Sequence, residues 1–151
     1  MTKKIMAIFM LLLISCGGFA RDITFFSGPY HCELDDFSIS IRRYNGSEAE
    51  VNIPAKIEGK KVTQIDERAF DGNSKLTAVT IPQGVRDIED FAFRGCTNLR
   101  TVVIPSSVKE IDERAFEGCS DLTIKCENGS YAQRWVNYYG AYLGIKCDPT
   151  L

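Results

Sequence analysis

The chain has 151 residues, of which 44% are hydrophobic and 25% are charged, and its formal net charge is −2. This length and composition are typical of one soluble globular domain. No segment is basic enough to favour nucleic acid as a partner, so we expect no nucleic-acid binding.

The first twenty residues have the pattern of an export signal. Lys3 and Lys4 precede an apolar run over residues 5–14, which is too short to span a bilayer and is followed by small residues. We therefore assign residues 1–20 to a signal peptide and expect the domain to occupy residues 21–151. Its location would then be the cell surface, the outer envelope or the medium.

Two processing sites fit this leader, and the sequence leaves both open. Cleavage after Ala20 would make Arg21 the N-terminus. Alternatively, residues 13–16, Leu-Ile-Ser-Cys, are similar to a bacterial lipobox, in which the signal ends before Cys16 and a lipid is attached to that residue. In the second case the lipid on Cys16 would be the only membrane contact.

Residues 37–54 are expected to form an N-terminal β-hairpin. Apolar and polar residues alternate over residues 37–41, which predicts a half-buried strand. Asn45 and Gly46 give a strong turn signal, because both tolerate positive φ. Alternation resumes at Val51 and Ile53. A hairpin here would cover the apolar face of the first repeat.

Residues 55–126 repeat one pattern with a step of 23 residues. The same positions are occupied by Val62, Val85 and Val108, by Phe70, Phe93 and Phe116, and by Leu76, Leu99 and Leu122. A period of this length with apolar residues at fixed offsets indicates a leucine-rich solenoid. The sequence therefore predicts an α/β solenoid, a short leucine-rich repeat array with an N-terminal hairpin and a C-terminal capping helix.

Each repeat reads as a short strand followed by a helical turn. Val102 and Ile104 are expected to point inward, and Pro105 ends the strand because it cannot donate to a ladder. Asp112 suits the start of a short helical turn, where a carboxylate is favourable. Gly118 stands where a helix often ends with positive φ.

Residues 127–151 are expected to cap the last repeat. Ser130 and Gln133 form a capping-box pattern, and the apolar residues that follow have helical spacing up to Gly140. The helix would lie over the open end of the array, with Trp135 and the nearby tyrosines filling the core.

The cysteines divide into two groups. Cys96 and Cys119 occupy equivalent repeat positions, and stacked cysteines have poor disulfide geometry, so we expect buried thiols. Cys126 and Cys147 flank the C-terminal segment, and export permits disulfides. A bridge between them would add roughly 3 kcal/mol, and Cys32 would be left over.

The repeat over residues 102–122, with Val-Val-Ile-Pro-Ser-Ser-Val followed by Ile-Asp-Glu-Arg-Ala-Phe-Glu-Gly-Cys, resembles the BspA-type leucine-rich repeat family. Residues 53–62 and 129–132 resemble the family's first repeat and its closing segment, so the similarity covers about residues 37–147. Asn73 departs from the pattern because the family has a cysteine there. The resemblance implies an exported or surface-displayed bacterial binding protein, since some relatives bind host matrix or plasma proteins or take part in adhesion.

The outward face of the strand row is the candidate partner-binding surface, because a repeat protein commonly uses this face. No aromatic or arginine anchor stands there, so binding is expected to be weak or multivalent. The candidate residues are Glu50, Asn52, Ala78, Thr80, Thr101, Val103, Thr123 and Lys125.

No pattern in the sequence points to catalysis, a metal or a cofactor. His31 and Cys32 are sequence neighbours, which rarely gives nucleophile–base geometry, and the acidic pairs of the repeats suit turn capping better than calcium. The sequence thus predicts a non-enzymatic protein-binding module, adhesin-like, whose ligand is a host matrix or plasma glycoprotein or a protein of a neighbouring cell. The alternative is an envelope lipoprotein with a structural or regulatory role that binds an envelope protein of the same cell.

Overall fold

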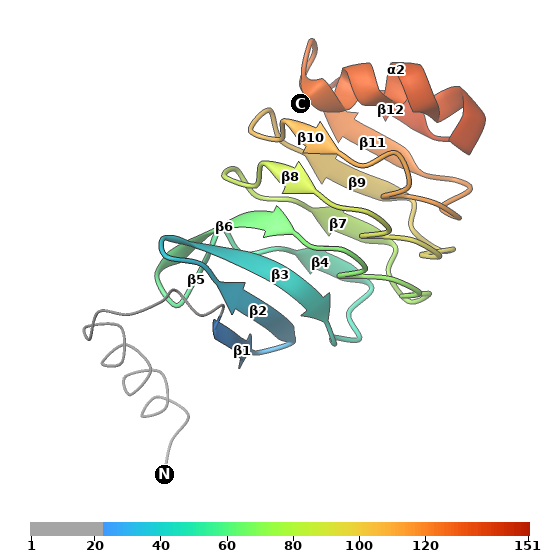
Figure 1. The fold of residues 1–151 in the computed structure, drawn as a ribbon. Coiled ribbons are helices and arrows are strands. Elements are labelled where there is room, and N and C mark those ends of the chain that lie inside the picture. Colours follow the sequence, from blue (N-terminus) through green and yellow to red (C-terminus); the bar gives the residue numbers. More distant parts are fainter. Residues whose placement is uncertain (1–22) are drawn as a thin grey trace.

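The computed structural model describes residues 23–151, which form two sheets and one helix (Figure 1). The predicted signal peptide and Cys16 lie outside these residues. No helix in the described part of the chain is long and apolar enough to cross a membrane.

The first sheet begins with an antiparallel meander and continues with parallel strands. Its strand order is β1-β2-β3-β6-β8-β10, and β5 pairs with β6. The strands are β1 (Ile23–Ser27), β2 (Tyr30–Leu34), β3 (Ser38–Tyr44), β5 (Lys56–Ile57), β6 (Lys60–Ile65), β8 (Asp87–Ile88) and β10 (Glu110–Ile111). Parallel pairing brings four buried isoleucines into one row, namely Ile41, Ile65, Ile88 and Ile111.

The second sheet is entirely parallel, with the order β12-β11-β9-β7-β4. Its strands are β4 (Glu50–Asn52), β7 (Ala78–Thr80), β9 (Thr101–Ile104), β11 (Thr123–Cys126) and β12 (Lys146–Asp148). The buried row on its inner side consists of Val51, Val79, Val102 and Ile124. Both inner sides pack on a single core, which no single repeat could form by itself.

The predicted hairpin over residues 37–54 is wrong. β3 pairs with β2 and β6 in the first sheet, whereas β4 pairs with β7 in the second. Asn45 and Gly46 therefore join strands of different sheets. The antiparallel cover at this end comes from β1 and β2, which pair with each other and, through β2, with β3.

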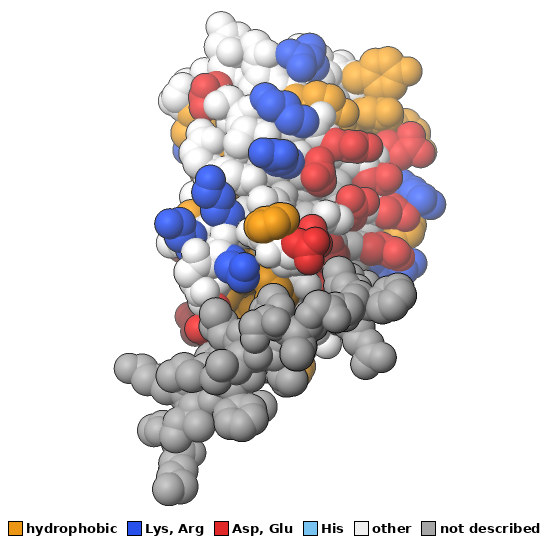
Figure 2. Space-filling view, turned by 60° about the vertical axis from the view of Figure 1, so that its left-hand side comes forward, with side chains coloured by type: hydrophobic (Ala, Val, Ile, Leu, Met, Phe, Trp, Pro, Cys, Tyr) orange, Lys and Arg blue, Asp and Glu red, His pale blue; other side chains and the backbone are white. Residues whose placement is uncertain are grey.

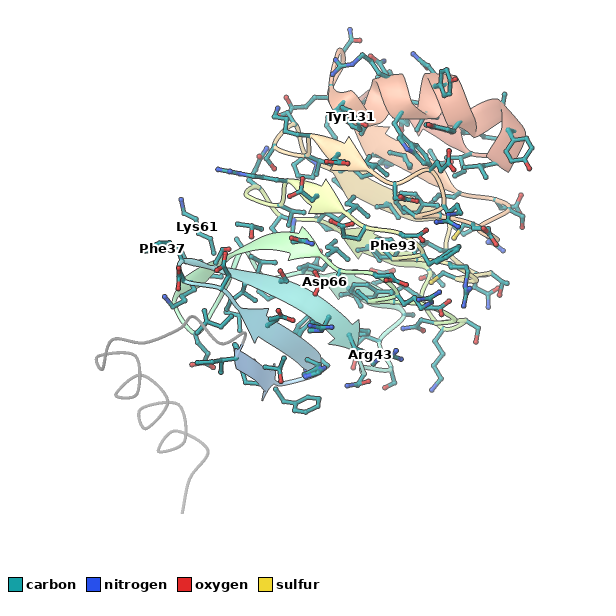
Figure 3. The ribbon with its side chains drawn as sticks, viewed as in Figure 1. Phe37, Arg43, Lys61, Asp66, Phe93 and Tyr131 are labelled. Carbon is teal, nitrogen blue, oxygen red and sulfur yellow. The ribbon has the colours of Figure 1, made fainter. Side chains whose placement is uncertain are left out.

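A column of aromatic rings runs through the core along the turns that lead from the first sheet to the second. The ring centroids of Phe70 and Phe93 are 4.9 Å apart, and those of Phe93 and Phe116 are 5.2 Å apart. Tyr44 continues the column at one end at 5.0 Å from Phe70, and Trp135 closes the other at 5.7 Å from Phe116. Such pairs add about 0.5–1.5 kcal/mol each beyond their burial. Phe93 marks the middle of this column in Figure 3.

The short helical turns predicted in each repeat are hydrogen-bonded turns that follow one another. None of them extends into an α-helix within residues 55–126. In the last repeat Ala115 donates its backbone N–H to the carbonyl of Asp112 at 3.1 Å, and Cys119 donates to Phe116 at the same distance. The Asp112 carboxylate accepts the backbone N–H of Arg114 at 2.9 Å, which is the capping role expected of it. Gly118 has the expected positive φ, 80°.

The two repeat cysteines are buried free thiols, as predicted. Cys96 donates to the carbonyl oxygen of Phe70 at 3.1 Å, and Cys119 donates to that of Phe93 at 3.2 Å. Burial raises the pKa of Cys96 to about 12 and that of Cys119 to about 11. Each thiol thus links its own repeat to the preceding one and stays protonated at neutral pH.

The C-terminal helix α2 (Tyr131–Leu143) lies across the end of the stack (Figure 1). Ser130 caps it by accepting the backbone N–H of Gln133 at 3.2 Å, and the Gln133 side chain accepts the N–H of Gly129 at 2.7 Å. Both partners of the predicted capping box are therefore used. The helix ends at Leu143, before Gly144 at φ 71°, three residues beyond the predicted end at Gly140.

Trp135 is buried, as expected, but the tyrosines of α2 do not all fill the core. Tyr138 is 80% exposed and Tyr142 is 90% exposed. The spacing of the helix places them on the side that faces away from the last repeat. The expectation that the tyrosines near Trp135 are core residues is therefore wrong for these two.

Candidate functional site: the outer face of the second sheet

The eight predicted contact residues lie together on the outer face of the second sheet. Parallel register arranges them in two rows across four strands. One row contains Glu50, Ala78, Thr101 and Thr123, and the other contains Asn52, Thr80, Val103 and Lys125. The residues between the rows are the buried valines and isoleucine of the core, so the alternation inferred from the sequence is confirmed.

β12 extends this face by one strand that sequence reasoning did not include. Lys146 is the register partner of Thr123, and Asp148 is the register partner of Lys125. The centre of the face thus holds small side chains of threonine, alanine and valine. Charged side chains stand at its two ends, with Glu50 on β4 and Lys146 on β12. The sequence does not predict β12, because a strand of three residues is too short to show a clear alternation.

Cys126 and Cys147 meet behind this face. Their sulfur atoms are 3.4 Å apart and both thiols are free in the structure. Burial is the main cause that raises the pKa of Cys147 to about 11, and the adjacent Cys126 adds to it. The structure therefore brings the predicted pair together without a bond, and the disulfide stays a prediction.

The only histidine does not form a reactive pair with its neighbour. His31 stacks on the ring of Phe26 at a centroid distance of 4.6 Å, whereas Cys32 is completely buried on the other side of β2. Burial raises the pKa of Cys32 to about 11. The two side chains point to opposite faces of the strand, so they cannot act together as nucleophile and base.

No group of three His, Cys, Asp or Glu side chains within residues 23–151 is arranged to hold a metal ion. A shallow polar depression of about 690 Å³ lies instead on the first sheet, with Arg42, Asp66 and Glu89 among its lining residues. Burial raises the pKa of Asp66, which the Arg42 guanidinium partly opposes. The acidic pairs had been interpreted as turn caps, and the sequence alone gave no sign that they share a surface.

An arginine and aromatic cluster flanks that depression. Arg68, Arg94 and Arg114 lie 5.1, 4.8 and 4.5 Å from the centroid of the Phe91 ring. Arg94 also forms a two-point ion pair with Asp71, at 2.9 and 2.8 Å. Arg68, Phe91 and Arg114 occupy the same position in successive repeats, and Arg94 follows Phe91 by three residues. The cluster therefore holds three repeats together.

Two sheets built from repeated strands around an aromatic core define a leucine-rich repeat fold. A model of the BspA type leucine rich repeat region matches residues 44–131, so the chain belongs to the BspA-type leucine-rich repeat family. Members of this family are typically bacterial surface or secreted proteins, and leucine-rich repeat proteins of this kind are generally non-enzymatic modules that bind proteins. No curated protein matches the chain.

Solved structures show the same fold. A leucine-rich repeat protein of T. pallidum is 30% identical, with a TM-score of 0.63 over 69% of this chain and 53% of that one. A leucine rich cell surface protein from Faecalibacterium prausnitzii is 35% identical, with the same TM-score over 70% of this chain and 30% of that one. A leucine-rich repeat protein from Bacteroides capillosus is 25% identical, with a TM-score of 0.52 over 67% and 97%. The chain therefore spans about half and about a third of the first two relatives.

Proposed function

We propose that this chain is an exported, adhesin-like module that binds a protein partner through the outer face of the second sheet. The observation that carries the proposal is the arrangement of the eight contact residues in two continuous rows on one parallel sheet. Membership of a family of surface proteins supports the same function, as does the similarity to a leucine rich cell surface protein of known structure.

The character of the face suits a partner that binds weakly at each site. Thr80 is exposed and Thr101 and Val103 are half-buried, and none of the eight contact residues is an aromatic or arginine anchor. Display of many copies at a cell surface would compensate, because linked sites rebind at high effective concentration. The proposed ligands are host matrix or plasma glycoproteins.

A binding screen tests this function. The chain starting at Arg21 contains every element that the structure describes, and it would be displayed in many copies on beads and exposed to immobilised matrix and plasma glycoproteins. Saturable binding is the expected result. Failure to bind any of them, by a sample shown to be folded, would contradict the adhesin proposal. It would favour the alternative, an endogenous envelope partner, which crosslinking in the native cell would identify.

A further inference from the structure

Two columns of opposite charge lie side by side on the outer face of the first sheet. Figure 2 shows the blue side chains rising through several repeats and the red ones beside them. The basic column consists of Lys61, Arg86 and Lys109, near the beginnings of β6, β8 and β10. The acidic column consists of Asp66, Asp87, Glu89, Glu110 and Asp112. Asp87 and Glu110 are the first residues of β8 and β10, whereas Asp66, Glu89 and Asp112 follow the last residues of β6, β8 and β10. Lys61 and Asp66 mark the two ends of β6 in Figure 3.

Parallel register places like charges next to each other within each column. Asp87 is the register partner of Glu110, and the backbone N–H of Lys109 donates to the carbonyl of Arg86 at 2.7 Å. Neighbouring carboxylates, together with burial as the larger cause, raise the pKa of Glu89. Like charges on adjacent strands are destabilising, so the fold by itself gains nothing from this arrangement.

The two columns do not neutralise each other within one molecule. The ion pairs formed by residues 23–151 involve the arginines at positions 42, 68, 94 and 114, and none joins the basic column to the acidic column. Arg86, Lys109 and Glu110 are exposed. Their charges are therefore available to another molecule.

We propose that this face is an interface between two copies of the chain. The two copies are related by a twofold axis that runs parallel to the two columns and between them. Rotation by 180° about such an axis lays the basic column of each copy over the acidic column of the other. The contact is then self-complementary, as a twofold interface requires. A purely basic partner would match the acidic column but would be repelled by Arg86 and Lys109, so charge complementarity favours a second copy.

An apolar side chain stands on the same face. Phe37 is 86% exposed, and it lies close to Lys61 near the beginnings of β3 and β6 (Figure 3). Its neighbour Asp36 accepts a hydrogen bond from Lys60 through its carbonyl at 3.5 Å. Aromatic residues are enriched at protein–protein interfaces, and the pairing would cover this one. The pairing does not rest on the proposed function, and it would leave the outer face of the second sheet of both copies open.

Sedimentation velocity of the chain starting at Arg21 tests the pairing, with three samples beside the wild type. One variant carries Asp87→Lys with Glu110→Lys, and the other carries Arg86→Glu with Lys109→Glu. The third sample is their equimolar mixture. The wild type is expected to dimerise at low salt, about 50 mM, and to lose at least about tenfold in affinity at high salt, because exposed charges are screened.

Each variant alone is expected to be a monomer, because residues 86, 87, 109 and 110 of its face then all carry the same sign of charge. The mixture is expected to form a mixed dimer. A wild type that stays monomeric at low salt would overturn the proposal, as would a variant that dimerises like the wild type, or a mixture that stays monomeric. Binding of an oligo-lysine peptide to a monomeric wild type, lost only in Asp87→Lys with Glu110→Lys, would also overturn it and would indicate a basic partner instead. Circular dichroism and thermal unfolding verify that both variants are folded.

Discussion

The rings of Phe93 and Phe116 are stacked with their planes inclined by only 5° and their centroids 5.2 Å apart. They come from equivalent positions of successive repeats, so the stacking depends on both repeats being in the same register. Neither ring is accessible to water by more than 1%. The aromatic column therefore contributes to joining the repeats into one cooperative unit.

Phe93→Ala is expected to reduce the free energy of unfolding by about 3–5 kcal/mol, because it removes a large buried side chain and leaves a cavity between two rings. Urea unfolding followed by circular dichroism measures the change, at high salt and low protein concentration, where the chain is expected to be monomeric. Phe37→Ala is the matched control, since its side chain is 86% exposed and its loss is expected to change the free energy by less than about 0.5 kcal/mol. Similar changes in the free energy of unfolding for both variants would contradict the stabilising role of the aromatic column.

Gly140 is a second sensitive position, although it lies in the middle of a helix where alanine is ordinarily favoured. A Cβ at this position would stand 2.7 Å from the carbonyl oxygen of Ile145 and 2.8 Å from Val136 Cγ1. Gly140→Ala is therefore expected to destabilise the cap by about 1–3 kcal/mol. Hydrogen exchange of α2 would measure the loss. Asn137→Ala, an alanine substitution at an exposed site of the same helix, is the control and is not expected to reduce protection. If the amides of α2 were better protected from exchange in Gly140→Ala, the close contact of position 140 with Ile145 and Val136 would be absent.

Oxidation is expected to join Cys126 to Cys147, whose sulfur atoms already lie 3.4 Å apart. With oxidised glutathione as the oxidant, the chain would lose two hydrogen atoms and release two molecules of glutathione. The bridge would raise the free energy of unfolding by roughly 3 kcal/mol. Because the pKa of Cys147 is raised to about 11, the reaction is expected to accelerate as the pH rises toward that value.

Peptide mapping by mass spectrometry measures the pairing. Cys147→Ser is the control and should abolish the bridge while Cys32, Cys96 and Cys119, which are buried, remain thiols. A disulfide between any other pair would contradict the arrangement of the C-terminal cap.

The acidic column makes stability depend on pH through Glu89. Its pKa is raised in the folded state, mainly by burial and further by Asp87, Glu110 and Asp112, so the folded protein binds this proton more tightly than the unfolded chain. The resulting stability is present below the ordinary pKa of 4.5 and is lost as the pH rises through the raised value. Glu89→Gln is expected to be more stable than the wild type at pH 7 and to lose that advantage at low pH. The urea midpoints of the wild type and Glu89→Gln are measured at both pH values, at high salt and low protein concentration. A difference between the two midpoints that is the same at both pH values would contradict this prediction.

The repeats were predictable because their pattern is periodic, whereas the N-terminal end was not. Val102 and Ile104 alternate with outward residues and occur at fixed offsets, so their burial follows from the sequence. Residues 23–34 form β1 and β2 without such repetition, and only tertiary pairing with β3 reveals their role. The turn at Asn45 and Gly46 gave a true local signal, but a turn does not determine whether the strands on either side pair with each other.

The outward-facing residues of the candidate site were predictable for a similar reason, whereas its full extent was not. Alternation identified which residues of β7 and β9 face outward. The additional strand β12 depends on the helix returning the chain beside β11, which no local pattern indicates. The charge columns of the first sheet arise from register between repeats, so Asp87 and Glu110 had to be placed in space before their common surface could be recognised.

The measurement that most directly tests the binding face compares two triple variants against one glycoprotein ligand found in the screen. The face variant carries Thr80→Lys, Thr101→Glu and Val103→Lys. The control variant carries Ser74→Lys, Thr97→Glu and Ser120→Lys, which are the same charge changes at exposed turn positions. We expect the face variant to weaken binding by at least about tenfold, since charges would be buried at the centre of the contact, and the control to bind as the wild type does. Equal binding by both variants would place the site elsewhere and contradict the proposed function of this face.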